Sequence, residues 1–500
     1  MDMSSRLDNS INQRFSSRLG LLVSALGIAV GTGNIWRFPR IAAQSAGSQG
    51  AGAFLLVWVL FLLIWSIPLI IGEYALGKKH RAGPIGIFLK SAGKRFSWMG
   101  SFVALVTTAI SFYYAVIVGW CIYYLLQSLI NPLPRSTDES FQIWNHFQGS
   151  AWPFLFHFIA LVLAALAIWK GVSSIEKVNK ILIPSLLTIL LLCVARAVSL
   201  PGAGEGLRYL FSIQWSQLRE PGIWLAALTQ NAWDTGAGWG LFLTYASYMQ
   251  IRHGAVKNAF ITGIGNNTIS LLAGVMIFGT VFAILQKDPG MPNQEILAVM
   301  KTSGPASTGL TFIWLPQLFQ RMFLGSPLAV LFFLGLSFAG FTSLIAMLEL
   351  TTRVLLDKGL KRPTAILIVV GFVYLLGIPS ARSTDFLSNQ DFVWGLGLLI
   401  SGAFIAIALR KNDIRVITAE INAVEGDWKT GRWWMLNICY FIPAAAVILL
   451  FWWMFLSVTV FAPGDWMNPF NPFSIMTCLV QWGTFIIIFL LCNRFIIKGL

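Results

Sequence analysis

A carboxylate stands in the middle of a long apolar stretch of this sequence. Residues 228–242 read LTQNAWDTGAGWGLF, and Asp234 is followed there by Gly236, Gly238 and Gly240. An aspartate at membrane depth costs about 2.5 kcal/mol or more unless it faces a cation, a cavity or a partner. The glycines favour an unwound stretch, which would free carbonyls and amides to bind ions and polar solutes. The residue types therefore indicate a binding site, although Asp234 would also suit a cap on the half-helix after the break.

A second apolar stretch is interrupted in the same way. Residues 27–39 read GIAVGTGNIWRFP and place Gly31, Gly33 and Asn34 in the middle of the first apolar run. Glycines in a membrane helix also permit close packing between helices, so this stretch alone fits either role. Together with the break around Asp234, it predicts two unwound helices whose freed amides attract an anionic group and whose freed carbonyls coordinate a cation.

Both interrupted stretches belong to a chain that is too apolar for a soluble domain. Of its 500 residues 56% are hydrophobic and 11% are charged, and the mean hydropathy is +0.72. We therefore predict an all-α polytopic membrane protein. Twelve apolar runs have bilayer-spanning length, and they lie at residues 19–41, 52–77, 99–129, 152–169, 174–198, 222–250, 258–285, 327–356, 363–380, 391–409, 434–461 and 474–493. No small-residue cleavage site precedes the first run, and we expect no removable signal peptide.

The positions of the two interrupted runs divide the chain into repeats. A division after the fifth run gives five helices over residues 19–198 and five over 222–409, each set opening with a broken helix, and leaves two accessory helices over 434–493. An odd number of spans in each set inverts the second set relative to the first. Broken helices at matching positions of inverted halves indicate a substrate and ion site near the midplane. We expect one transporter domain over residues 1–500 and no enzymatic activity.

The positive charges set the expected orientation. Most of the 35 lysines and arginines fall in loops that face inward if the N-terminus is cytoplasmic, so both termini are expected in the cytoplasm. This topology and contact with anionic lipid explain the net charge of +15 without a nucleic-acid partner. The four histidines and five cysteines show no metal-ligand spacing, and no Walker loop indicates an ATP-driven pump.

A series of short motifs runs along nearly the whole chain. They are RLG, GTGNIWRFP, GAGAF, GEYALG, FYY, TYASY, FAGFTS and the DF that begins at Asp391. In this order they resemble the neurotransmitter:sodium symporter family, and in general character its bacterial amino-acid members. The resemblance implies the LeuT-type fold and sodium-driven amino-acid uptake by alternating access across the plasma (inner) membrane, with no need for an oligomer.

The resemblance implies two sodium sites. One would combine carbonyls of the first and eighth runs with two hydroxyls, and its residues here are Gly27, Val30, Ala339, Thr342 and Ser343. Five oxygens suit a hard cation. The residues of the other site would be Ala29, through its carbonyl, and Asn34, Asp234 and Asn266, through their side chains. Asn266 fits the family's spacing to a later serine and glycine better than Asn267 does, and Asp234 stands where threonine or serine is usual.

The resemblance also implies an amino-acid site. The groups that would hold the substrate's carboxylate and ammonium belong to Ala29, Thr32, Gly33, Tyr114, Trp233 and Asp234. The pocket for its side chain would be lined by Ile110, Tyr114, Trp233, Gly236, Trp239, Ser343 and Met347. This lining is apolar and aromatic, so neutral hydrophobic or aromatic amino acids fit best. Gly31 stands where monoamine-carrying relatives have an aspartate, which favours a substrate that brings its own carboxylate.

Charged residues would gate the site from the extracellular side. Arg37, just after the first break, and Asp391, at the start of the tenth run, match the family's extracellular pair. Trp233 would act as an aromatic lid. Lipid-facing snorkelling is a poor explanation for Arg37, because this arginine follows the break directly.

The cytoplasmic gate departs from the family pattern. Asp357 matches the acidic partner, but the usual arginine and tryptophan before the first run are replaced by Asn12 and Phe15. Arg14 or Arg6 would have to take the place of the missing arginine, and the sequence leaves the choice open.

These residues predict a sodium-coupled symporter for neutral amino acids that needs no chloride. Chloride-dependent relatives hold an anion near the position of Ser270, whereas here Asp234 supplies a negative charge, and Trp58 replaces a tyrosine that is usual near the anion. Proton uptake by Asp234 during the empty return step would give proton antiport as a lesser alternative. The main alternative class is a receptor or scaffold that binds amino acid without transporting it, and a channel is a weaker third.

Overall fold

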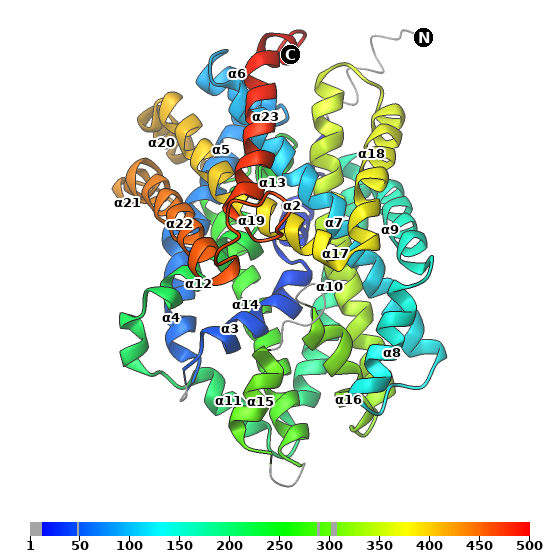
Figure 1. Cartoon of the computed structure of the whole chain (residues 1–500). Helices are drawn as coiled ribbons and strands as arrows, with labels where there is room; N and C mark the ends of the chain where they lie inside the picture. The colour runs from blue at the N-terminus through cyan, green and yellow to red at the C-terminus, as the bar shows by residue number, and fades with distance from the viewer. Residues whose placement is uncertain (1–12, 48–49, 288–290, 302–307) are drawn as a thin grey trace.

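The computed structural model describes residues 13–47, 50–287, 291–301 and 308–500, and every regular element in these ranges is a helix (Figure 1). Nine helices of the described part are long and apolar enough to cross a membrane, or up to eleven if each of two bent pairs forms one span. The predicted sixth span is divided into α12 (Pro221–Asp234) and the short α13 (Leu241–Ala246). The expected all-α membrane fold is confirmed, and the helices are consistent with the twelve expected spans.

The helices follow the predicted runs closely. Residues 19–198 correspond to α2 (Arg18–Ala29), η1 (Gly33–Arg37), α3 (Phe38–Ser45), α4 (Gly52–Phe61), η2 (Leu62–Ser66), α5 (Ile67–His80), α6 (Pro84–Ala92), α7 (Ser97–Ile130), α8 (Thr137–Gln148), α9 (Trp152–Ile168) and α10 (Val172–Val198). After α11 (Ala203–Phe211) and η3 (Trp215–Arg219), the second half continues from α12 and α13 with α14 (Val256–Leu285), α15 (Asn293–Lys301), η5 (Leu310–Trp314), α16 (Leu315–Gln320), α17 (Gly325–Asp357), α18 (Arg362–Arg382) and α19 (Thr384–Lys411). The last part contains α20 (Ile414–Asn422), α21 (Arg432–Leu436), η6 (Asn437–Phe441), α22 (Ile442–Leu456), η7 (Ser457–Phe461) and α23 (Ile475–Ile496).

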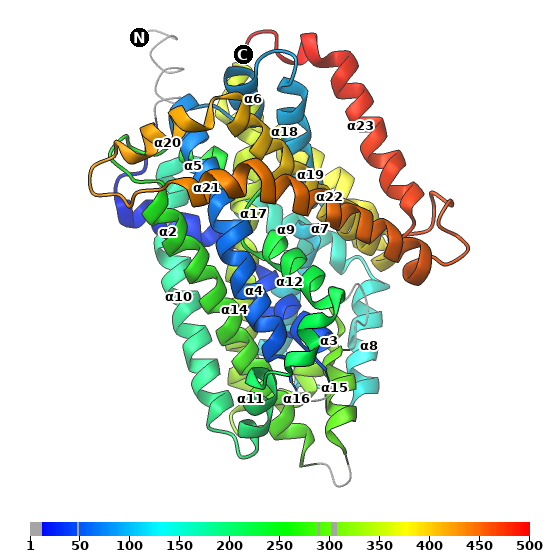
Figure 2. The same ribbon diagram turned by 90° about the vertical axis from the view of Figure 1, so that its left-hand side faces the viewer.

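The long helix α7 lies inside the bundle and packs against α17, α9, α19 and α18. Of its most apolar stretch 89% is buried, against 17% for α23. Figure 2 shows α23 at the edge of the bundle. The inner helices are therefore shielded from lipid by protein, and the two C-terminal helices cover the outside.

Loops that the positive charges assign to the cytoplasm meet at one end of the molecule. The Lys79 ammonium lies 2.8 Å from the carboxylate of Glu420, and Lys358 donates to the carbonyl of Lys498 at 2.9 Å. Both views place α6, α20 and the C-terminus at this end (Figures 1 and 2). The packing agrees with the predicted topology, and the direction of the chain across the bilayer stays a prediction.

Candidate functional site

The first break lies between α2 and η1. Val30 leaves the helix with φ −84° and ψ 99°, and the two helical pieces are bent by 51°. The Asn34 side chain holds the break, because its Oδ1 accepts a hydrogen bond from the Gly31 N–H at 2.8 Å. A side-chain amide thus replaces a backbone partner that the unwound turn has lost. The carbonyls that precede the break are left pointing toward neighbouring helices.

The second break follows Asp234, the last residue of α12. Gly236, Gly238 and Gly240 have φ of 71°, 86° and 78°, a region that favours glycine because it has no Cβ. The chain enters α13 directly after Gly240. Both predicted breaks are therefore present in the structure.

A buried carboxylate supports the second break. Glu73, on α5, accepts hydrogen bonds from the N–H groups of Gly238 at 2.6 Å and Leu243 at 3.3 Å, and it is fully buried. Leu243 lies in the first turn of α13, where a negative charge is favoured, and Gly238 lies in the break before it. Hydroxyls of Ser401 and Thr107 bond the carbonyls of Gly238 and Trp239, each at 2.5 Å. The sequence interpretation gave Glu73 no role, although a glutamate at membrane depth in the motif GEYALG is itself a signal.

A first oxygen cluster lies where α2 meets α17. The Thr342 hydroxyl lies 3.3 Å from the Val30 carbonyl and 3.0 Å from that of Ala339. The Ser343 hydroxyl lies 3.4 Å from the carbonyls of both Gly27 and Val30. The structure thus gathers all five oxygens predicted for one sodium site. Oxygen ligands of this kind and number suit a hard monovalent or divalent cation.

A second oxygen cluster lies between the two breaks and α14. One side-chain amide atom of Asn266 lies 3.0 Å from the Ala29 carbonyl oxygen, 3.1 Å from the backbone carbonyl oxygen of Asp234 and 2.7 Å from Asn34 Nδ2. The Asn34 amide is oriented by its bond to the Gly31 N–H, so Nδ2 is a donor and the Asn266 atom that it meets is oxygen. If the oxygen and nitrogen of the Asn266 amide were exchanged, the nitrogen would donate to the carbonyls of Ala29 and Asp234. It would then also face Asn34 Nδ2, which is a donor itself. Three oxygens therefore converge with no hydrogen among them, which is the arrangement that a cation stabilises.

The Asp234 carboxylate adjoins this second cluster. One of its oxygens lies 3.3 Å from Gln230 Nε2 and 3.4 Å from Ser270 Oγ, and the other has no hydrogen-bond partner among the described residues. The side chain is 4% exposed. A buried carboxylate with a free oxygen is costly unless a cation lies nearby. Within the cluster itself, Asp234 contributes its backbone carbonyl in this conformation.

A small cavity lies between the breaks and the scaffold helices. It is lined by Ile28, Ala29, Gly31, Gly33, Asn34, Tyr114, Trp233, Asp234, Gly236, Trp239, Ser343 and Met347. Most residues predicted for the substrate pocket are among them, and Thr32 bonds Tyr114 through its N–H at 3.1 Å. Ile110 is buried one turn before Tyr114 and is not a lining residue. The cavity volume is about 20 Å³, close to that of one water molecule, so any larger solute would require lining side chains to move.

Arg37, which we predicted as part of the extracellular gate, lies against an aromatic side chain. The Arg37 guanidinium lies 4.5 Å from the Trp233 ring centre, and Trp233 meets Trp239 edge to face at 5.7 Å. Asp391 accepts a hydrogen bond from the Tyr113 hydroxyl at 3.1 Å, and of the ion pairs among the described residues none joins Arg37 to Asp391. Asp391 also lies inside α19, about two turns after the helix begins, whereas we predicted it at the start of the tenth span.

Asp357, which we predicted as part of the cytoplasmic gate, pairs with a different arginine from the two considered. Asp357 binds Arg353 on its own helix at 2.9 Å and accepts the Gly83 N–H at 2.6 Å. Arg14 is not its ion-pair partner in this conformation, and Arg6 lies outside the described residues. The pair Arg353 and Asp357 has i,i+4 spacing on a helix, which the sequence alone could have suggested.

The segment before α2 is held by a separate group of contacts, which we call the Glu176 latch. The Glu176 carboxylate, on α10, accepts the Ser16 N–H at 2.7 Å, the Ser16 hydroxyl at 2.5 Å and the Ser17 hydroxyl at 3.2 Å. A Cβ on Gly20 would lie 1.9 Å from this carboxylate. The glycine of the RLG motif therefore makes room for Glu176, which the sequence interpretation did not identify.

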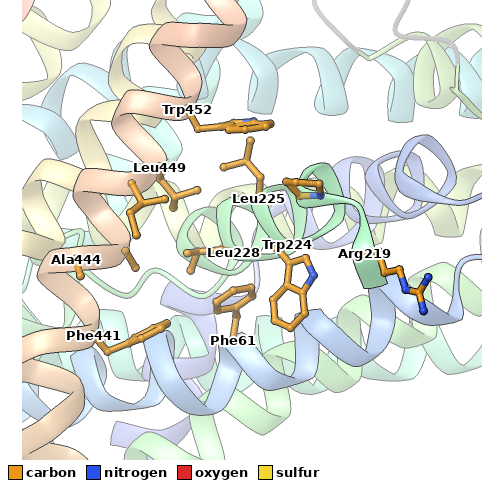
Figure 3. Close-up of a pocket in the computed structure, with 12 residues that line it drawn as sticks. Phe61, Arg219, Trp224, Leu225, Leu228, Phe441, Ala444, Leu449 and Trp452 are labelled. Atoms are coloured by element: carbon orange, nitrogen blue, oxygen red, sulfur yellow. The ribbon is translucent and has the colours of Figure 1, made fainter. Parts of the chain in front are cut away.

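A larger cavity lies away from this site. It has a volume of about 480 Å³ between α4, α12 and α22, and among its lining residues only Arg219 is charged (Figure 3). Figure 3 shows Arg219 beyond Trp224 at one end of an apolar group of side chains. The convergent polar groups of a solute site are thus found at the helix breaks and not in this larger space.

Two unwound helices, with one oxygen cluster between α2 and α17 and another between the two breaks and α14, are typical of helical secondary transporters. The model of the sodium:neurotransmitter symporter family matches residues 12–150 and 146–497, and the chain belongs to this family. It is accordingly a sodium-dependent transporter and not an enzyme.

Individual relatives agree with this assignment. An uncharacterized sodium-dependent transporter of Methanocaldococcus jannaschii is 31% identical over 73% of this chain and 74% of its own length. The uncharacterized sodium-dependent transporter YhdH of Bacillus subtilis is 28% identical over 88% of this chain and 96% of its own. The crystal structure of MhsT in complex with L-phenylalanine matches with a TM-score of 0.75 and 27% identity, covering 88% of this chain and 99% of that one. The LeuT-type fold expected from the sequence is confirmed.

Proposed function

We propose that this protein imports neutral, bulky amino acids together with sodium and does not require chloride. The observation that carries the proposal is the pair of oxygen clusters at the end of α2, which adjoin an aromatic cavity. A solute bound there would share backbone groups with both cations. The L-phenylalanine complex of MhsT supports the same class of substrate side chain.

The substrate's carboxylate is proposed to bind near Tyr114. The Tyr114 hydroxyl accepts a hydrogen bond from the Thr32 N–H, and a Cβ on Gly31 would lie 2.8 Å from this hydroxyl oxygen. These short approaches leave no room for a side chain at position 31. Trp233, Trp239 and Met347 would then surround the substrate's side chain after the two tryptophans move apart. Because none of these three is charged, a charged side chain would be buried without a partner.

Two sodium ions are proposed, one in each oxygen cluster. The cluster at Thr342 and Ser343 contains neutral oxygens only, as sodium permits. The cluster at Asn266 lies beside the Asp234 carboxylate, whose charge would balance the cation inside the membrane. Since that negative charge belongs to the chain, a bound chloride near Ser270 is not needed.

Uptake into proteoliposomes tests the proposal. Labelled L-phenylalanine should accumulate with a sodium gradient and not with a potassium gradient, and equally well in gluconate and in chloride. Asp234→Ser should lose transport in gluconate and regain it in chloride. Binding of the amino acid without sodium-driven accumulation would support a receptor, and a chloride requirement in the wild type would refute the role given to Asp234.

A further inference from the structure

Another pocket lies at the end of the molecule that we expect to face the cytoplasm. It has a volume of about 320 Å³ and lies between the end of α5, α20 and the segment 251–255. Three of its lining residues are cations, Lys78, Lys79 and Arg81, and Glu420 is its one acid. The other lining residues are aliphatic. The pocket therefore combines an excess of positive charge with an apolar wall.

The cations are held in place and keep free donors. Lys78 donates to the His253 carbonyl at 2.8 Å, Arg81 donates to the Met249 carbonyl at 3.3 Å, and Lys79 pairs with Glu420. An ammonium group has three N–H donors and a guanidinium has five, so each cation has donors beyond these bonds. The described lining residues carry three positive charges against one negative charge, and Asp427, which is not a lining residue, acts electrostatically on Lys78.

Arg81 is fixed by its backbone as well. It caps α5 with φ 50° and ψ 43°, a conformation that favours glycine, and its carbonyl accepts a hydrogen bond from Arg353 at 2.9 Å. Burial, followed by the charge of Arg14, lowers the pKa of Arg81 below its usual range. The charged form of Arg81 is therefore disfavoured by burial and by Arg14, and an anion bound in the pocket would stabilise it.

The pocket lies where a bilayer surface is expected. Both views show α20 beside the C-terminal end of α5 (Figures 1 and 2). Trp428 and Trp433, which follow α20, are 49% and 39% exposed and pack on Phe260, as aromatic residues at a membrane interface do. Ile251, a lining residue, is 72% exposed. A ligand that has an anionic head and an apolar tail matches both parts of the pocket.

We propose that this pocket binds the headgroup of an anionic phospholipid from the surrounding bilayer. The phosphate would accept hydrogen bonds from Lys78 and Arg81, and the start of an acyl chain would lie along Ile417 and Ile421. The lipid would join α5 to α20 and to the segment 249–255. This site is separate from the helix breaks and does not depend on the transport activity.

Lipid titration of the purified, delipidated full chain tests this site. Native mass spectrometry would count bound phosphatidylglycerol and bound phosphatidylcholine. We expect preferential binding of phosphatidylglycerol, and Lys78→Gln with Arg81→Gln should weaken it about thirtyfold for the two charges. Glu420→Gln should strengthen binding, because it removes the acid among the lining residues, while Lys78 and Arg81 keep their backbone partners. This variant keeps the test decisive if the double variant fails to fold.

Arg415→Gln is the matched control, because Arg415 is an exposed cation on α20 outside the pocket. It should leave the affinity unchanged. Equal binding of the two lipids, an equal loss in Arg415→Gln, or weaker binding in Glu420→Gln would overturn the proposal. Displacement of the lipid by inorganic phosphate at similar concentrations would assign the site to a free anion, and would overturn it as well.

Discussion

Replacing Glu176 by glutamine should loosen the start of α2. The carboxylate accepts the Ser16 N–H with one oxygen and the Ser16 hydroxyl with the other. A glutamine can accept the Ser16 N–H with its oxygen and donate to the Ser16 hydroxyl with its NH₂ group, so both hydrogen bonds lose the charge of their acceptor. A hydrogen bond to a charged group contributes about 1.5–3 kcal/mol, so we expect the latched state to lose about 2–3 kcal/mol relative to the open one. The Lys180 pair adds little to this figure because Lys180 is 37% exposed.

A loss of this size is large enough to measure. Because about 1.4 kcal/mol corresponds to a factor of ten, the population with an open latch should rise about 30- to 150-fold. Hydrogen exchange of peptides covering residues 13–26 reports this opening, since the amides of Ser16, Gly20 and Leu21 are all bonded in the latch or in the first turn of α2. Exchange in the variant should be faster by the same factor.

The control for this measurement is Glu205→Gln. Glu205 pairs with Arg208 at 3.3 Å but is 46% exposed and lies far from α2 in the sequence. Exchange of residues 13–26 should not change in that variant. If a folded Glu176→Gln protein exchanged these amides at the wild-type rate, the latch would have no energetic role and the reasoning would be refuted.

Three further predictions concern the helix breaks. Thr342→Ala combined with Ser343→Ala should abolish sodium-driven uptake in proteoliposomes while the protein stays folded, because both hydroxyls of one cation cluster are removed; normal transport would exclude this cluster as a sodium site. Gly31→Asp should weaken amino-acid binding in a thermal-shift titration, because its Cβ would lie 2.8 Å from the Tyr114 hydroxyl and its charge beside the substrate carboxylate; unchanged affinity would place the carboxylate elsewhere. Glu73→Gln should lower the free energy of unfolding in detergent by about 1–3 kcal/mol, because one buried N–H of the second break loses its acceptor; an unaltered melting temperature would contradict this.

The breaks themselves were predictable from the sequence because their causes are local. Gly236, Gly238 and Gly240 have the positive φ that such a glycine cluster favours, and Asn34 satisfies the Gly31 amide three residues before it. The residues of the oxygen clusters were predicted from the motif resemblance. Their oxygens come together because the motifs lie on the expected helices.

Contacts between distant segments could not be predicted in the same way. Ser16 and Glu176 are 160 residues apart, and Glu73 lies 165 residues before Gly238. Nothing in either local sequence specifies its partner, because the pairing depends on how α5 and α10 pack in three dimensions. Helix phase has a similar limit: Ile110 and Tyr114 share one face of α7, but only the packed structure shows that Tyr114 alone reaches the cavity.

Helix α2 contacts both oxygen clusters at its end and the Glu176 latch at its start. Its last carbonyl, on Ala29, enters the cluster at Asn266, and the next one, on Val30, enters the cluster at Thr342. A cation in either cluster would therefore tie α2 to a scaffold helix, α14 in one case and α17 in the other. The Glu176 latch ties the other end of the same helix to α10. For α2 to move, both ends must be released, so cations that bind the clusters should also slow exchange at the latch by thermodynamic linkage.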